Sequence, residues 1–152
     1  MATQNGNRLP GTVIDGKYRI ETVIGVGGMG TVCRAVQLSI DRTVAIKLLH
    51  PAYAQDSTQV ERFQREARLA AAIGHDNICE VTDLGRDASG TPYLVMPLLK
   101  GRSLADVLSD AGGILPLQRL GDIVSQTLSA LDAAPADCKQ PRPNHFQSLH
   151  PG

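Results

Sequence analysis

The sequence predicts an α+β domain in which a five-stranded antiparallel sheet carries one main helix and is followed by two further helices and an irregular tail. Short runs of alternating apolar and polar residues, separated by glycine-rich or polar turns, occupy much of the chain before residue 97. This pattern is typical of strands joined by hairpins. Longer runs with apolar residues three or four positions apart interrupt it once and return after residue 102, which indicates amphipathic helices.

The five strands are expected at residues 17–24, 31–37, 43–49, 77–84 and 91–96. The first two flank a glycine-rich turn and so form a hairpin. Side chains in the third strand alternate between the two faces of the sheet, which places Lys47 on the same face as Ala45 and Leu49. That face therefore combines a lysine with apolar neighbours.

The main helix is expected over residues 57–73. Asp56 followed by Gln59 is a capping signature for its start, and Gly74 supplies the stop. At about 100° per residue the apolar positions gather on one side, and Glu66 falls within that apolar arc. On the helix pattern alone, Glu66 either pairs with a cation on the buried side or lies at the edge of the arc and reaches water.

Two further helices are expected after residue 102. Ser103 with Asp106 caps a short helix that ends near Leu108, and Pro116 stands where the first residue of the second helix is expected. The second helix extends to about residue 134 and carries an apolar stripe made of Leu117, Leu120, Val124, Leu128 and Leu131. Without a covering surface, this stripe forms an exposed apolar patch.

The composition favours a cytoplasmic protein without a general affinity for polyanions. The 152 residues include 15 basic and 15 acidic side chains, so net charge gives no reason to expect nucleic acid or a membrane surface as a partner. No apolar run approaches the roughly 18 residues that span a bilayer. The three cysteines lie far apart and no secretory signal precedes them, which is typical of reduced thiols.

Both ends of the chain are expected to be disordered. Residues 1–13 are polar and aperiodic, and residues 135–152 are rich in proline and lose the apolar period, so this second tail is disordered or aberrant. Cys138, His145 and His150 lie in it, but a fourth ligand is missing and their spacing matches no usual zinc pattern. We therefore predict no metal site there.

The most informative stretch runs from Ile24 to Val32 and has glycines in G-x-G-x-x-G spacing. Glycine lacks a Cβ and adopts positive φ at little cost, so this backbone can turn tightly and bring N–H groups against a phosphate. A dinucleotide-binding fold requires a helix after the third glycine, whereas β-prone residues follow Gly30. A P-loop requires a lysine where Thr31 stands, and an ordinary glycine-rich turn remains the alternative on these residues alone.

Three features, in this order along the chain, resemble the N-terminal lobe of a protein kinase. They are the G-x-G-x-x-G-x-V turn, the lysine in Val44-Ala45-Ile46-Lys47, and Glu66 on the next helix. Gly27-Gly28-Met29-Gly30 is similar to the form common in bacterial serine/threonine kinases of eukaryotic type. The resemblance covers roughly residues 18–134. It implies an N-lobe over about 14–96, a hinge at 97–101 and the start of a C-lobe at 102–134.

The resemblance also implies ATP and Mg²⁺ as cofactors and assigns roles to individual residues. Lys47 would bond the α- and β-phosphates, and Glu66 would pair with Lys47 and favour its charged form. Proline at position 97, where the family often has glutamate, keeps the backbone C=O that contacts adenine, and the N–H of Leu99 would be the donor. The implied nucleotide-binding residues are Ile24, Gly25, Val26, Gly27, Gly28, Met29, Gly30, Val32, Ala45, Lys47, Met96, Pro97 and Leu99.

One departure from the family concerns catalysis. The sequence contains no His-Arg-Asp catalytic loop and no Asp-Phe-Gly, which hold the catalytic base and protein ligands of Mg²⁺. We interpret the chain as the ATP-binding part of a truncated serine/threonine kinase, inactive alone, with residues from 135 onward read in a shifted frame or past a broken junction. The alternatives are a pseudokinase-like nucleotide-binding or interaction module and, less favoured, a dinucleotide-binding oxidoreductase. The protein substrate or partner is unknown.

Overall fold

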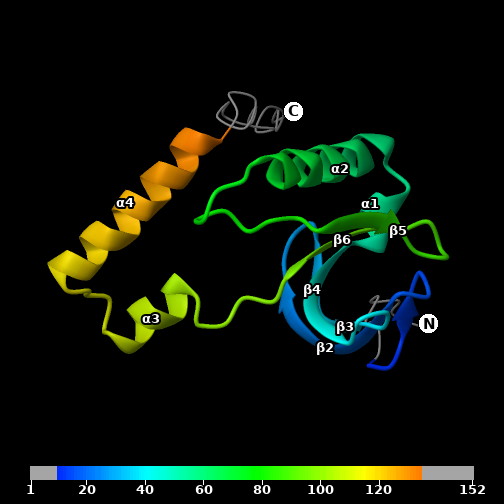
Figure 1. The fold of residues 1–152 in the computed structure, drawn as a ribbon, viewed down its shortest axis with the longest axis horizontal. Coiled ribbons are helices and arrows are strands. Elements are labelled where there is room, and N and C mark those ends of the chain that lie inside the picture. Colours follow the sequence, from blue (N-terminus) through cyan, green and yellow to red (C-terminus); the bar gives the residue numbers. More distant parts are fainter. Residues whose placement is uncertain (1–9, 135–152) are drawn as a thin grey trace, which may run out of the picture.

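The computed structural model describes residues 10–134 and places a curled antiparallel sheet beside two groups of helices (Figure 1). The strands are β1 (Val13–Ile14), β2 (Tyr18–Val26), β3 (Gly30–Gln37), β4 (Arg42–Leu49), β5 (Asp83–Arg86) and β6 (Pro92–Pro97). The helices are α1 (Pro51–Ala54), α2 (Ser57–Ala72), α3 (Leu104–Asp110) and α4 (Leu117–Ala133). The predictions for residues 1–9 and for the tail, including Cys138, His145 and His150, fall outside the described residues.

The sheet has six strands in the order β1-β2-β3-β4-β6-β5, and each neighbouring pair is antiparallel. The prediction of five strands missed β1, because two residues are too few to show an alternating pattern. The predicted strand at 77–84 was too long, since β5 begins only at Asp83. Residues 75–78 instead form a turn, in which the N–H of Ile78 donates to the His75 carbonyl at 3.0 Å.

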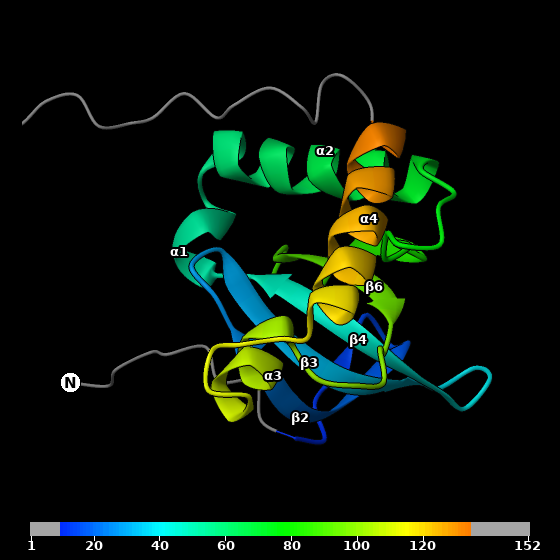
Figure 2. The ribbon, with the colours of Figure 1, turned by 90° about the vertical axis from the view of Figure 1, so that its left-hand side faces the viewer.

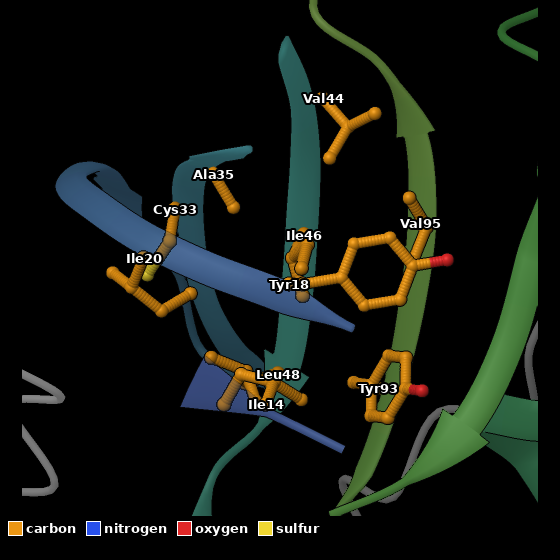
Figure 3. Packing of buried hydrophobic residues seen from close by; sticks show 10 residues of the cluster. All are labelled: Ile14, Tyr18, Ile20, Cys33, Ala35, Val44, Ile46, Leu48, Tyr93 and Val95. Atoms are coloured by element: carbon orange, nitrogen blue, oxygen red, sulfur yellow. The ribbon is translucent and has the colours of Figure 1, made fainter. Parts of the chain in front are cut away.

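The sheet is curled, and the main core fills the inside of the curl (Figure 3). The rings of Tyr18 on β2 and Tyr93 on β6 pack edge to face with centroids 6.0 Å apart. The Tyr18 hydroxyl donates to Asp83 at 2.6 Å, and the Tyr93 hydroxyl donates to Asp15 at 3.0 Å. The buried cluster comprises Ile14, Tyr18, Ile20, Cys33, Ala35, Val44, Ile46, Leu48, Tyr93 and Val95.

These hydrogen bonds join residues that are distant in the sheet order, and they perturb the groups involved. Burial first, and then the hydrogen bond to a carboxylate, raise the pKa of both phenols, Tyr18 and Tyr93. The hydrogen bonds from Lys17 and then Tyr93 lower the pKa of Asp15. The charge states of these four groups therefore affect the hydrogen bonds that join distant parts of the curl.

Helix α2 covers one end of the opposite face of the sheet. Its buried residues Val60, Phe63 and Ala67 form a second cluster with Leu49 and Leu94. The predicted cap is confirmed, because Oδ1 of Asp56 accepts from the N–H groups of Thr58 and Gln59 at 2.9 and 3.3 Å. The four-residue α1 before it was not predicted, since a single turn started by a proline carries no helical period.

Helices α3 and α4 extend away from the sheet (Figures 1 and 2). The cap of α3 is confirmed, since Oγ of Ser103 accepts from the N–H of Asp106 at 3.1 Å. Two hydrogen bonds of 3.0 Å tie α4 to the loop after α2, from Asn77 Nδ2 to Gln126 Oε1 and between His75 Nε2 and Ser129 Oγ. Pro116 lies one position before α4 and not at its first residue.

The apolar stripe of α4 is exposed, as the sequence predicts for an uncovered stripe. The exposed fractions run from 45% at Leu120 to 83% at Leu117, with Val124, Leu128 and Leu131 between them. Within residues 10–134 no helix is long and apolar enough to cross a membrane.

Candidate functional site

The strand register brings several predicted site residues to one face of the sheet. Val32 on β3 pairs with Lys47 on β4, and Ala45 on β4 pairs with Met96 on β6. Cross-strand partners point to the same face, and Ala45 and Lys47 share a face because they are two residues apart. This is the face that α2 covers at its far end, where half-buried Met96 packs against the cluster beneath the helix.

The glycine turn lies between β2 and β3, at the edge of this face. The N–H of Gly27 donates to the Gly30 carbonyl at 2.9 Å, which closes the turn. On β2 beside it, Ile24 and Val26 are exposed by 49% and 73%, which leaves their apolar surfaces open to solvent.

The turn uses glycine differently from the prediction. None of Gly25, Gly27, Gly28 and Gly30 adopts a positive φ, so the turn does not use this freedom of glycine. Gly30 is required by close packing instead, because a Cβ would overlap the carbonyl oxygen of Leu48 on β4. A Cβ on Gly28 would meet nothing within 4 Å, so the tip of the turn borders open space that a ligand can occupy.

Lys47 and Glu66 do not form the predicted pair in this structure. The Lys47 ammonium lies over the ring of Phe63, 5.9 Å from its centroid. Glu66 lies one helical turn further along α2, where its carboxylate is 3.4 Å from the Arg62 guanidinium and its side chain is 45% exposed. No ion pair joins Lys47 to Glu66 within the described part of the chain.

The position of Glu66 corrects the expectation that it points inward. The buried line of α2 runs through Val60, Phe63 and Ala67, and Glu66 lies at the edge of that line, as the alternative interpretation held. A flexible carboxylate at such an edge turns outward when an arginine on the preceding turn of the helix, here Arg62, offers a partner.

The hinge residues lie beside a cavity of about 540 Å³ that is separate from the glycine turn. Pro97 and Leu99 line it together with the loop between α2 and β5, including Ile78 and Cys79. None of the other predicted nucleotide-binding residues lines this cavity. The structure therefore brings Val32, Ala45, Lys47 and Met96 together, whereas Leu99, in the middle of the hinge, is 72% exposed.

The sequence interpretation missed His50, the residue after β4. Its backbone N–H donates to the Met29 carbonyl at 3.0 Å, and its Nε2 is 3.0 Å from the Gly27 carbonyl oxygen. A register signal was present, because pairing Gly30 with Leu49 sets residue 50 opposite the tip of the turn.

Comparison with known proteins supports the resemblance found in the sequence. The protein kinase domain family matches residues 18–134. Serine/threonine-protein kinase pkn3 of Myxococcus xanthus is 41% identical over 136 residues, which are 88% of this chain and 24% of that protein. Serine/threonine-protein kinase PrkC of Bacillus subtilis is 39% identical over 123 residues, 81% of this chain and 19% of that protein.

Solved structures agree with the fold. The crystal structure of the Mycobacterium tuberculosis PknI kinase domain matches with a TM-score of 0.71 and 30% identity, over 82% of this chain and 49% of that one. The chain thus spans half or less of the proteins that it resembles. The family match over residues 18–134, the relatives and the shared fold together show that this chain belongs to the protein kinase family.

Proposed function

We propose that this chain binds ATP on the sheet face beneath the glycine turn, as the nucleotide-binding part of a serine/threonine protein kinase. The observation that supports this most is the register, which aligns Val32, Ala45, Lys47 and Met96 beside a turn with open space at its tip. Apolar side chains with one cation suit a ligand that is flat and apolar at one end and anionic at the other. The corresponding divisions are an N-lobe over about 14–96, a hinge at 97–101 and a C-lobe start at 102–134.

Each proposed contact follows from the chemistry of its residue. Lys47 bonds the α- and β-phosphates once its ammonium leaves the Phe63 ring, because an anionic oxygen is a far stronger partner than an aromatic face. Glu66 joins Lys47 only if it gives up its place beside Arg62. Adenine lies against Ile24, Val32, Ala45 and Met96, with the Pro97 C=O and the Leu99 N–H as its hinge partners.

No group of three or more histidine, cysteine, aspartate or glutamate residues within 10–134 is arranged to hold a metal. Mg²⁺ here would be bound through the phosphates of ATP, and no step of the proposed function depends on a protein ligand for it.

A second candidate is a non-catalytic nucleotide-binding or interaction module. It is favoured by the exposed apolar stripe of α4. Phosphate transfer from radiolabelled ATP to a generic serine/threonine substrate by this chain would exclude the module, and it would also refute the expectation that the chain is inactive alone. In either case we place this part of the protein in the cytoplasm, where ATP is present and where Cys33 and Cys79 stay as thiols.

A thermal-shift titration with Mg-ATP tests the proposal. Binding to the folded state raises the unfolding temperature, and the rise grows with the logarithm of the ligand concentration relative to Kd, so we expect a shift for the wild type and a smaller one for Lys47→Ala. Lys17→Ala is the matched control, because Lys17 pairs with Asp15 at the other end of β2 and its loss should leave the ligand-induced shift unchanged. No shift in the wild type at millimolar Mg-ATP would overturn ATP binding.

A further inference from the structure

We propose that His50 is a positioning residue that holds the glycine turn in the shape needed to receive phosphate. This inference rests on the proposed ATP site, and it assigns to His50 a role in binding the phosphates without touching them. Its evidence is a pair of hydrogen bonds from one residue to two carbonyls of the turn.

The two hydrogen bonds come from different parts of His50. Its backbone N–H donates to the Met29 carbonyl at 3.0 Å and continues the ladder between β3 and β4 beyond Leu49. Its ring Nε2 lies 3.0 Å from the Gly27 carbonyl oxygen. A carbonyl oxygen only accepts, so Nε2 carries the proton and donates. The His50 ring therefore holds Gly27, the first residue of the closed turn, and the His50 backbone holds Met29, the third.

The hydrogen bond from Nε2 of His50 fixes the direction of the Gly27–Gly28 peptide group at the tip of the turn. The Gly27–Gly28 peptide is trans, because the described residues contain no cis bond, so its C=O and N–H point in opposite directions. Since the Gly27 C=O faces His50, the Gly28 N–H faces away from it. The same reasoning applies to the peptide between Met29 and Gly30. A Cβ on Gly28 would meet nothing within 4 Å, so space remains for a phosphate oxygen beside that N–H.

The hydrogen bond from the His50 ring matters because the turn is otherwise ordered by its backbone alone, through the Gly27–Gly30 hydrogen bond and the strands that it joins. Gly27 and Gly28 lack side chains to pack, and both residues are exposed. A glycine-rich segment that is disordered before binding loses conformational entropy on binding, and this loss weakens affinity. A hydrogen bond made before the ligand arrives removes part of that loss. From the usual net strength of one such bond, losing it should weaken ATP binding about 3- to 10-fold.

The test compares His50→Leu with His50→Gln in the full chain. Leucine fills similar space without a donor, whereas glutamine can donate to the Gly27 carbonyl through its amide. Tyr18→Phe is the matched control, since it removes one side-chain hydrogen bond at the other end of β2. Affinities for Mg-ATP and for adenosine are measured by titration calorimetry. Amide hydrogen exchange is measured without nucleotide at the N–H groups of Gly27 and residue 50, which donate within and onto the turn.

We expect His50→Leu to weaken ATP binding about 3- to 10-fold, to leave adenosine binding unchanged, and to speed exchange at both amides by a similar factor. His50→Gln should restore most of both effects, and Tyr18→Phe should show neither. Equal exchange in the wild type and His50→Leu, or a loss of adenosine affinity equal to that of ATP, would overturn the role of His50. If the wild type binds no ATP, the proposed function and the phosphate part of this inference fall together, whereas the exchange comparison still decides whether His50 holds the turn.

Discussion

Substituting Gly30 by alanine should unfold the junction between β3 and β4. An added Cβ would overlap the Leu48 carbonyl oxygen, because Cβ atoms essentially never approach another heavy atom closer than 3.0 Å. It would also lie 3.1 Å from the carbonyl carbon of the same residue. The obstruction is backbone of the neighbouring strand, which cannot rotate aside as a side chain can. Relief therefore requires β3 and β4 to separate where Gly30 pairs with Leu49.

The expected cost combines two terms. Forcing a methyl group into a packed site costs about 1–3 kcal/mol, and weakening a ladder hydrogen bond at the same place adds about 0.5–1.5 kcal/mol. We therefore expect Gly30→Ala to lower the free energy of unfolding by about 2–4 kcal/mol, a large part of the roughly 5–15 kcal/mol typical of a domain. Urea denaturation followed by circular dichroism measures this directly.

Gly28→Ala is the control for Gly30→Ala. It makes the same chemical change on the same turn, but its Cβ would meet nothing within 4 Å and its φ is not positive. Its unfolding free energy should therefore stay within about 0.5 kcal/mol of the wild type. Equal stabilities for the two variants would refute the reasoning, because it depends entirely on the Leu48 carbonyl.

Three further predictions concern the closed sheet, α2 and α4. The folded state raises the pKa of Tyr18 above the unfolded value of about 10. The contribution of Tyr18 to stability is therefore complete below about pH 10 and is lost at higher pH. Tyr18→Phe should flatten the fall in urea midpoint between about pH 9 and 11. Glu66→Gln should change the unfolding free energy by less than about 0.5 kcal/mol, since its pair with Arg62 is exposed and within one helix; a cost above about 2 kcal/mol in the same urea assay would indicate a buried partner instead. Leu128→Ser should reduce the fluorescence of a bound hydrophobic dye and leave the unfolding temperature unchanged, because Leu128 is 60% exposed.

Much of the fold was predictable because local signals agreed with the tertiary structure. Alternation identified β2, β3 and β4, and the caps at Asp56 and Ser103 located the starts of α2 and α3 within a residue. The prediction started this strand at Asn77, whereas β5 begins only at Asp83. The N–H groups of Asn77 and Ile78 instead donate to Nδ1 and to the carbonyl of His75, which forms a turn. The hydrogen bonds from His75 and Asn77 to α4 also produce no periodic pattern in the sequence.

The candidate site was predictable to the extent that it depends on strand register. Alternation in β4 put Ala45 and Lys47 on one face, and the structure adds their partners Met96 and Val32. The contact of Lys47 with Phe63 could not be predicted, because it depends on how α2 lies against the sheet. The sequence shows which face of its helix or strand a residue occupies, but it does not show which residues of separate elements contact each other.

Glu66 shows where this limit lies. Helical periodicity placed it near the apolar arc, and both Lys47 and Arg62 are compatible with that position. The pair with Arg62 leaves both side chains 40–45% exposed and involves one helix, so it is worth only about 0.3–0.5 kcal/mol. A pair with Lys47 would take both groups toward the interior, where desolvation opposes the attraction. A ligand that draws Lys47 off the Phe63 ring and binds better to one arrangement shifts Glu66 toward that arrangement by the difference in its affinity for the two.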